Sequence, residues 1–371
     1  MNKKTYFITG GGTGGHIYPA IAVADKLLTM DTTQKIYYVG NPNNLEAEIV
    51  SQKDYEFLPV ISSGMPRKIS FQFIIWAFRM LHAWFECCKY IKKYKPDAIF
   101  GTGGYVSAPV LMAAITMKVP FVMHDCDANP GLVTRKLSPY VKSISLAFED
   151  AKYKLHNKNC YINGNPIRDK FKTLTKQQAR KDLSLEDKLT ICIMGGSQGA
   201  KTINDASVKI LKTLSHVYNI QIIFQTGKKN FESVINQLKE IYPEYNEDKN
   251  IIIKPYFDDM VTVLKACDIA VSRAGSLSIS ELCASGTAPI FIPYPYAAAD
   301  HQRKNAKCMV ENGAGLYLEN SDTNEQTLLE LLTSLIKNPE MLEEIQKSTQ
   351  KLAKYDGTEQ IIKQIENCCS N

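Results

Sequence analysis

The sequence lacks the features of several protein classes. None of its 10 cysteines forms a Cys-x-x-Cys pair, and four of them stand as the adjacent pairs Cys87-Cys88 and Cys368-Cys369. This pattern argues against a zinc site or a disulfide framework and favours a reducing compartment. No apolar run reaches the roughly 20 residues that span a bilayer. The net charge of +6 is too small to indicate a dedicated nucleic-acid-binding protein, so we expect no nucleic-acid partner.

The sequence does contain a repeated order of apolar strand, glycine loop and helix. With 371 residues, of which 44% are hydrophobic and 22% charged, the chain is long enough for two globular α/β domains. Each glycine motif follows an expected strand, and the motifs occupy 10–16, 101–105, 195–200 and 272–275. Carboxyl ends of parallel strands share one edge of a sheet, where α/β proteins bind ligands. We therefore predict two doubly wound, Rossmann-like domains that face each other across a cleft and bind phosphorylated ligands.

The first loop, 10–16, has six residues of glycine or threonine and ends at His16. It lacks the Lys-Ser/Thr ending of a P-loop and the spacing of a dinucleotide fingerprint, so neither an ATPase nor a dehydrogenase follows. Its glycines let the backbone approach a bulky ligand and leave N–H groups for ligand oxygens. From its position, His16 is either a general base or merely the cap of the helix expected over 17–28.

The stretch from Ser272 to Ala306 predicts a nucleotide-sugar site. An expected strand over 268–272 leads through Gly275 into a helix over 277–284, for which we expect Ser276 to be the N-cap. The backbone N–H groups there favour phosphate, Arg273 adds a fixed positive charge, and Glu281 is placed to accept from ribose hydroxyls. Asp300, His301 and Gln302 suit sugar hydroxyls. The alternative is an ordinary Ser/Gly turn with Glu281 as a solvated helix residue.

The segment 66–96 is apolar around most of an expected helix and carries a basic tail. One interpretation is a core helix. The other is a segment that lies on an anionic membrane surface, since aromatic residues and a lysine cluster favour that position and Arg79 excludes a true span. We favour membrane contact through Ile75, Trp76, Arg79, Trp84, Lys89 and Lys92.

Six motifs in order resemble the MurG family of bacterial glycosyltransferases, and the resemblance covers essentially the whole chain. They occupy 10–16, 101–105, 165–168, 195–200, 272–275 and 300–302. The family transfers N-acetylglucosamine from UDP-N-acetylglucosamine to undecaprenyl-pyrophosphoryl-N-acetylmuramoyl-pentapeptide (lipid I), forming lipid II and UDP with inversion. The resemblance implies a GT-B fold, with an acceptor- and membrane-binding domain at 1–164 and a donor-binding domain at 165–356. A last helix at about 357–371 is expected to pack back on the first domain.

The resemblance also implies partners and a location. The expected partners are UDP-N-acetylglucosamine, lipid I and the anionic inner face of the cytoplasmic membrane, with other cell-wall enzymes as further candidates. We expect a peripheral protein on the cytoplasmic side of that membrane. We expect no cofactor and no metal, because Arg168, Arg273 and the helix N-terminus at Gly275-Ser276 can stabilise the departing UDP.

Family roles carry over to matching positions of this chain. His16 and Asp127 are the expected catalytic residues. The donor-binding positions are Thr13, Gly14, Gly15, Asp127, Arg168, Ser197, Phe257 (through its backbone), Arg273, Ser276, Leu277, Ser278, Glu281, His301 and Gln302. The acceptor-binding positions are Gly14, Gly15, Gly103, Gly104 and Tyr105.

Asp127 departs from the family pattern. The family usually reads His-Glu-Gln-Asn where this chain has His124-Asp125-Cys126-Asp127, so an aspartate replaces an asparagine that contacts the donor. An ionised aspartate only accepts hydrogen bonds and would repel a pyrophosphate. We expect Asp127 to be compensated by a cation, either His16 or His124, or else to be held protonated.

Three other functions stay open at this point. A GT-B transferase acting on another lipid, such as a diacylglycerol glycosyltransferase, is the nearest. A UDP-N-acetylglucosamine 2-epimerase shares the fold and needs no lipid contact. A non-catalytic UDP-sugar-binding subunit would bind donor without turnover.

Overall fold

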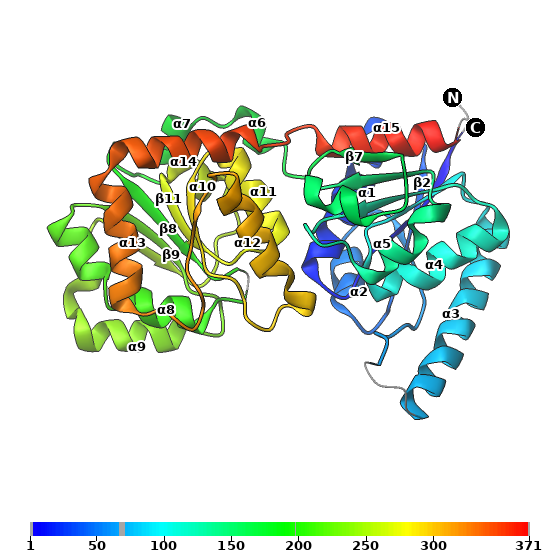
Figure 1. Cartoon of the computed structure of the whole chain (residues 1–371), viewed down its shortest axis with the longest axis horizontal. Coiled ribbons are helices and arrows are strands. Elements are labelled where there is room, and N and C mark those ends of the chain that lie inside the picture. The colour runs from blue at the N-terminus through cyan, green and yellow to red at the C-terminus, as the bar shows by residue number, and fades with distance from the viewer. Residues whose placement is uncertain (1–2, 67–70, 197, 370–371) are drawn as a thin grey trace. The chain divides into compact units, whose positions relative to one another are not determined.

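The structure is a computed structural model that describes residues 3–66, 71–196 and 198–369, and the chain divides into two compact units (Figure 1). Unit 1 comprises Met1–Ile167 and Asp356–Asn371, and unit 2 comprises Arg168–Tyr355. The chain therefore crosses between the units twice, once on each side of unit 2.

Unit 1 is built on a seven-stranded parallel sheet of order β3-β2-β1-β4-β5-β6-β7. Its strands are β1 (Thr5–Thr9), β2 (Lys35–Gly40), β3 (Glu56–Pro59), β4 (Ala98–Gly101), β5 (Phe121–Asp125), β6 (Ser143–Leu146) and β7 (Cys160–Ile162). Its helices are α1 (Gly14–Met30), α2 (Leu45–Val50), α3 (Phe71–Tyr94), α4 (Gly104–Met117), α5 (Leu132–Leu137) and α15 (Gly357–Cys369). The central strands β1, β2, β4 and β5 are almost wholly buried, as expected for a parallel sheet covered on both faces, whereas the edge strands β3 and β7 are partly exposed.

Two apolar cores cover the faces of this sheet. On one face, Ala83, Cys87 and Ile91 of α3 pack with residues of α4 and with Phe7 and Ile99 of the sheet. On the other face, α1 packs together with Ile361, Ile362, Ile365 and Cys368 of α15. Figure 1 shows α15, in red, lying against unit 1, where it contacts α1, β4 and β5. The last helix thus completes the core of unit 1.

Unit 2 repeats this plan with a six-stranded parallel sheet of order β10-β9-β8-β11-β12-β13. Its strands are β8 (Thr190–Met194), β9 (Gln221–Gln225), β10 (Ile251–Lys254), β11 (Ile269–Ser272), β12 (Ala288–Phe291) and β13 (Leu316–Tyr317). Its α-helices are α6 (Lys170–Thr173), α7 (Lys176–Asp182), α8 (Lys201–Val208), α9 (Phe231–Ile241), α10 (Met260–Ala266), α11 (Ser276–Ser285), α12 (His301–Glu311), α13 (Glu325–Lys337) and α14 (Pro339–Lys351). The predicted class, two doubly wound Rossmann-like domains, is confirmed.

The strand order determines where each unit can bind a ligand. In unit 1 the winding reverses between β1 and β4, and in unit 2 it reverses between β8 and β11. Ligands of doubly wound sheets bind outside the carboxyl ends of the strands at such a reversal. The four glycine loops follow these four strands directly. Each unit therefore has a pair of glycine loops at its reversal point.

Helix α3 has two different halves. Its second half carries the buried Ala83, Cys87 and Ile91, whereas its first half is largely exposed, with Phe78 at 68% and Phe71 at 74% exposure. The indole N–H of Trp76 donates to the Ser63 carbonyl at 2.9 Å, and that of Trp84 donates to Thr116 Oγ1 at 3.2 Å. Both tryptophans are half-buried and line an apolar groove of about 600 Å³ between α3 and α4. In the described part of the chain, no helix is long and apolar enough to cross a membrane.

Two helix starts differ from the predictions. Helix α1 begins at Gly14, three residues before the expected start, so the last two glycines of the first loop form its first turn. Helix α11 begins at Ser276, and its N-cap is Gly275 rather than Ser276, with no side-chain cap bond. The prediction of Ser276 as N-cap was wrong, because Gly275 already adopts the extended backbone of an N-cap and Ser276 is helical.

Candidate active site

His16 lies in the first turn of α1, and its ring orientation is determined by Thr102. His16 Nδ1 lies 2.8 Å from the Thr102 carbonyl oxygen, and the Thr102 hydroxyl donates to the His16 carbonyl at 2.6 Å. A carbonyl can only accept, so Nδ1 carries the proton and Nε2 of the neutral ring carries the lone pair. This tautomer is the one that a general base acting through Nε2 requires.

The second glycine loop makes room for this ring. A Cβ on Gly103 would lie 3.4 Å from His16 Cε1, and one on Gly104 would lie 2.5 Å from the Gly11 carbonyl and 3.1 Å from His16 Cδ2. Both glycines also have positive φ, +89° and +75°. Gly103 is the N-cap of α4 and Gly104 its first residue. The two loops of unit 1 thus pack against each other, and the predicted base His16 lies beside the predicted acceptor positions Gly103 and Gly104.

His124, at the end of β5, is fully buried and neutral. Nε2 lies 2.9 Å from Asn165 Oδ1, and Nδ1 lies 3.1 Å from Ser145 Oγ. Burial lowers the pKa of His124 to about 4, against the smaller raising effect of its hydrogen bond with Asn165. His124 is therefore not the cation that compensates Asp127, and that part of the prediction was wrong. Of the two expected partners, His16 remains.

Asp125 is a buried acid that sequence reasoning passed over. Its Oδ1 accepts from the backbone N–H of Asp127 at 3.2 Å, and its Oδ2 accepts from the N–H of Gly131 at 3.0 Å. Burial raises the pKa of Asp125, as does the nearby Asp127 charge. By bonding both ends of the loop after β5, Asp125 determines where Asp127 lies.

The remaining predicted positions of unit 1 surround this loop pair. Thr13 is the N-cap of α1, and Gly14 and Gly15 are its first two residues. The phenol oxygen of Tyr105 accepts from Asn44 Nδ2 at 3.0 Å. The sequence predicted that the N–H groups of this loop are left for ligand oxygens. One of them is not, because Gly12 N–H donates to the buried Glu46 at 3.3 Å.

In unit 2, two predicted donor-binding residues contact each other. Arg168 Nη2 donates to Glu281 Oε1 at 2.8 Å, with the arginine side chain 45% exposed and the glutamate 23%. Burial raises the pKa of Glu281, and the Arg168 charge opposes that effect. Glu281 is therefore not a freely solvated helix residue. It is a half-buried carboxylate in the second turn of α11.

Arg273, in the loop after β11, is held more tightly than predicted. Its Nη1 donates to the carbonyls of Ile292 and Pro293, each at 2.9 Å, and to Asn320 Oδ1 at 2.7 Å. The guanidinium also lies 5.7 Å from the centroid of the Tyr294 ring. Burial lowers the pKa of Arg273 to about 10, so it stays a cation at neutral pH. The side chain is a fixed charge beside α11, with one nitrogen already engaged by protein oxygens.

The other predicted donor positions lie at the same edge of the unit 2 sheet. Ser276, Leu277 and Ser278 form the first turn of α11, and His301 and Gln302 begin α12 after β12. Gln302 Oε1 accepts from the Tyr294 N–H at 2.9 Å, and the Phe257 N–H donates to buried Gln225 at 2.9 Å. Any backbone contact of Phe257 with a base would therefore use its carbonyl. Ser197 lies outside the described residues.

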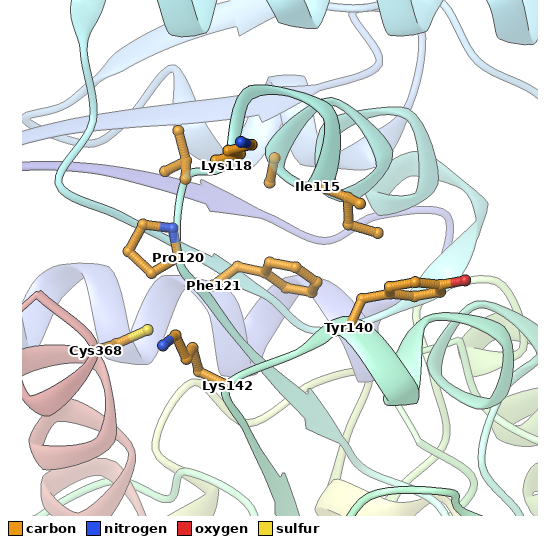
Figure 2. Close-up of a pocket in the computed structure, with 9 residues that line it drawn as sticks. Ile115, Lys118, Pro120, Phe121, Tyr140, Lys142 and Cys368 are labelled. Carbon is orange, nitrogen blue, oxygen red and sulfur yellow. The ribbon is translucent and has the colours of Figure 1, made fainter. Parts of the chain in front are cut away.

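A separate cavity of about 320 Å³ lies elsewhere in unit 1 (Figure 2). Figure 2 shows Phe121, at the start of β5, and Lys142, just before β6, with Cys368 of α15 nearby. The cavity is at the amino ends of these strands, away from the glycine loops. It contains none of the predicted site residues.

Two doubly wound units, each with paired glycine loops at its reversal point, have the architecture of the GT-B fold. The model of the glycosyltransferase family 28 N-terminal domain matches residues 6–146, and that of the family 28 C-terminal domain matches residues 190–361. The chain belongs to glycosyltransferase family 28.

Individual relatives agree with this assignment. The UDP-N-acetylglucosamine--N-acetylmuramyl-(pentapeptide) pyrophosphoryl-undecaprenol N-acetylglucosamine transferase of Desulforamulus reducens is 38% identical over 361 residues, 97% of each chain. The crystal structure of Acinetobacter baumannii MurG has a TM-score of 0.79 at 26% identity, covering 98% of this chain and 99% of that one. The resemblance to the MurG family is thereby confirmed.

The epimerase fold is also similar. A UDP-N-acetylglucosamine 2-epimerase from Neisseria meningitidis has a TM-score of 0.66 at 16% identity, covering 98% of this chain and all of that one. At this identity the likeness reflects the shared fold alone.

Proposed function

We propose that this protein transfers N-acetylglucosamine from UDP-N-acetylglucosamine to lipid I, with release of UDP. The relative from Desulforamulus reducens carries that activity in its name and aligns over nearly the whole chain. The observation in this chain that supports it best is the hydrogen bond between His16 and Thr102, which makes Nε2 the basic nitrogen at the reversal point of unit 1. The epimerase of Neisseria meningitidis matches this chain at only 16% identity.

The proposed chemistry is a single displacement. The 4-hydroxyl of the acceptor sugar gives its proton to His16 Nε2 and attacks the anomeric carbon of the donor. The bond from that carbon to the UDP oxygen breaks, and inversion turns the α-linked donor into a β-1,4 product. Thr102 stabilises the imidazolium that forms, because its carbonyl accepts from Nδ1–H.

Unit 2 supplies the groups for the leaving UDP. Arg273 is a cation held rigidly by three protein oxygens, and α11 begins directly after it with its backbone N–H groups at Ser276 and Leu277. A fixed cation and a helix N-terminus stabilise developing negative charge on phosphate. Arg168 is the third group, and Glu281 is placed for the ribose hydroxyls. On this basis we assign the donor mainly to unit 2 and the acceptor to unit 1, with Thr13, Gly14, Gly15 and Asp127 as the positions of unit 1 expected to reach the donor.

We further propose that α3 attaches unit 1 to the anionic face of a membrane as a peripheral protein. The helix exposes Phe71, Ile74, Ile75, Phe78 and Leu81 in its first half and Phe85 just beyond. Lys92 and Lys93 lie in its last turn, and Lys89 Nζ is 4.7 Å from the centroid of the Phe85 ring. Exposed aromatic residues beside lysines are typical of helices that bind anionic lipid.

The decisive experiment uses labelled UDP-N-acetylglucosamine with a soluble lipid I analogue. Release of UDP together with a lipid-linked disaccharide supports the transferase, UDP-N-acetylmannosamine supports the epimerase, and binding without turnover supports a non-catalytic subunit.

His16→Ala should lower kcat by about 10²–10⁴, the usual contribution of a general base. UDP affinity should stay nearly unchanged in this variant, because Arg168, Arg273 and Glu281, the groups proposed to hold UDP, belong to unit 2. The matched control is His156→Ala, which removes an exposed histidine of the same unit. A near-normal kcat for His16→Ala would move the base role elsewhere, with Asp127 next.

A further inference from the structure

A buried carboxylate lies under the first glycine loop and has no role in the proposed reaction. Glu46 belongs to the short helix α2 and is 0% exposed. Its Oε2 accepts from Gly12 N–H at 3.3 Å, and its Oε1 accepts from Asn41 N–H and Asn44 Nδ2, each at 3.2 Å. Within the described residues it forms no ion pair. A buried acid is costly unless its oxygens are hydrogen-bonded, so this placement requires all three donors.

The glycine loop is shaped around this carboxylate. A Cβ on Gly11 would lie 2.5 Å from Glu46 Oε1 and 2.9 Å from Val106 Cγ2, so a larger residue there would displace the Glu46 carboxylate. Gly12 has φ +84°, and a Cβ on it would lie 2.9 Å from Tyr105 Cε1. These two glycines let the loop lie directly on Glu46 and on the Tyr105 ring. The loop then leads without interruption into α1 and His16.

Glu46 is also connected to the second glycine loop. Asn44 Nδ2 bonds both Glu46 Oε1 and the Tyr105 hydroxyl, at 3.2 Å and 3.0 Å. Tyr105 follows Gly103 and Gly104, the two glycines that pack on the His16 ring. One carboxylate therefore joins the loop that carries His16 to the loop that accommodates its ring.

We infer that Glu46 is a positioning residue for the acceptor site, acting through Gly12 and Tyr105 without touching substrate. This inference rests on the proposed transferase function. It has a consequence for the acceptor as well. Gly12 N–H is taken by a carboxylate, so it is not a ligand for an acceptor phosphate oxygen. The N–H groups of Gly14, Gly15 and Gly104, at the starts of α1 and α4, have no acceptor four residues back within their own helix and are the candidates for that role.

The test compares Glu46→Gln with Glu48→Gln. Both changes remove one acid from α2, but Glu48 is exposed. The amide nitrogen of glutamine cannot accept, so Glu46→Gln loses either the Gly12 bond or the Asn41 and Asn44 bonds. Steady-state kinetics are measured with UDP-N-acetylglucosamine and a soluble lipid I analogue, with active enzyme counted by calorimetric UDP titration. For Glu46→Gln we expect the KM for acceptor to rise by about tenfold or more, as for a lost buried hydrogen bond to a charged group. The KM for donor and the UDP dissociation constant should stay within about twofold, and Glu48→Gln should match the wild type.

Two results would overturn the inference. One is an unchanged KM for acceptor with only a smaller active fraction, which is what a purely structural role produces. The other is equal behaviour of Glu46→Gln and Glu48→Gln. If Glu46→Gln does not fold, Asn44→Ala carries the same test, since it cuts the connection to Tyr105 at a half-buried loop position and should raise the same KM. A wild-type protein that does not turn over would instead overturn the proposed function.

Discussion

At the scale of single residues, two sets of predicted site residues have different partners. The histidines of unit 1 are held by neutral donors and acceptors: Thr102 orients His16, and Asn165 and Ser145 hold a neutral His124. In unit 2, Arg168 and Glu281 are opposite charges in contact. The first arrangement suits proton transfer, and the second suits an anionic ligand that can replace one partner of an ion pair.

The Arg168–Glu281 contact predicts that removing Arg168 changes the affinities for uridine and for UDP in opposite directions. A ribose hydroxyl that donates to Glu281 Oε1 competes with Arg168 for that oxygen, and a diphosphate then offers Arg168 a new partner. Arg168→Ala should therefore tighten uridine binding by about two- to fivefold, the effect of a partly exposed ion pair. The same variant should weaken UDP binding by about tenfold or more, since a charge-assisted bond to phosphate is lost. Calorimetry with uridine and UDP measures both.

Two further variants control this experiment. Glu281→Ala should weaken uridine and UDP alike, because the ribose contact is common to both. Lys170→Ala removes a neighbouring cation that pairs with Asp259 and should change neither affinity. Loss of both affinities in Arg168→Ala would show that Arg168 only supports Glu281.

Buried His124 makes stability depend on pH. Its pKa is about 4 in the folded protein and about 6.5 when unfolded, so the unfolded chain binds more protons between these values. The free energy of unfolding should therefore fall as pH drops from 6.5 toward 4, by about 3 kcal/mol from this residue. Asp125, with its raised pKa, acts in the opposite direction over part of the range.

A variant without His124 separates the effect of this histidine on stability from that of Asp125. Urea denaturation of wild type and His124→Gln at several pH values should give a shallower loss toward acid pH in the variant. His156→Gln, an exposed change in the same unit, should keep the wild-type slope. Identical slopes in wild type and His124→Gln would mean that His124 titrates normally in the fold.

At the scale of elements, α3 combines a packed half and an exposed half. The tryptophans that the sequence suggested as membrane anchors are half-buried and hydrogen-bonded within unit 1. The exposed apolar surface belongs instead to Phe71, Phe78, Leu81 and their neighbours. Sequence composition identified the helix, but only the packing of α3 against α4 shows which side chains face solvent.

The membrane prediction therefore concerns Phe78 and Leu81. The double change to serine should reduce binding to phosphatidylglycerol vesicles without loss of stability, because both side chains are exposed. Wild-type binding should weaken with salt, since each lysine near an anionic surface contributes about 1 kcal/mol. Vesicle sedimentation measures both effects, and Tyr153→Ser, an exposed aromatic change elsewhere in unit 1, is the control. Undiminished sedimentation of the double variant would contradict attachment through α3.

At the scale of the whole molecule, the end of the chain returns to its beginning. Helix α15 follows unit 2 in sequence but packs Ile361, Ile362 and Ile365 into the core formed by α1 and the unit 1 sheet. Unit 1 therefore cannot complete its core until the last residues of the chain are made.

This arrangement predicts that α15 stabilises unit 1. Ile361→Ala should lower the free energy of unfolding by about 2–5 kcal/mol, as for other isoleucines truncated in a core. Lys363→Ala, an exposed change on the same helix, should have little effect. Addition of UDP should still raise the stability of Ile361→Ala in the denaturation experiment, because UDP binds to unit 2 in the proposed function and α15 belongs to unit 1. Equal stability of the two variants would contradict a core role for α15.

The sequence by itself determined the class of fold and the kinds of residue at its reaction edge. Apolar strands followed by glycine loops predict parallel sheets, since both signals act over a few neighbouring residues. The positions of His16, Arg273 and Glu281 after those loops followed from the same local order.

Only the tertiary structure decided which partners these residues have. Glu46 contacts a loop 34 residues away, His16 a carbonyl 86 residues away, and Arg168 a carboxylate 113 residues away. Hydrogen bonds, burial and the resulting pKa values depend on which distant segments the sheet order brings together, and no local pattern encodes that distance. For this reason Glu46 and Thr102 carried no sequence signal of their roles, and His124 looked like a cation until its burial was known.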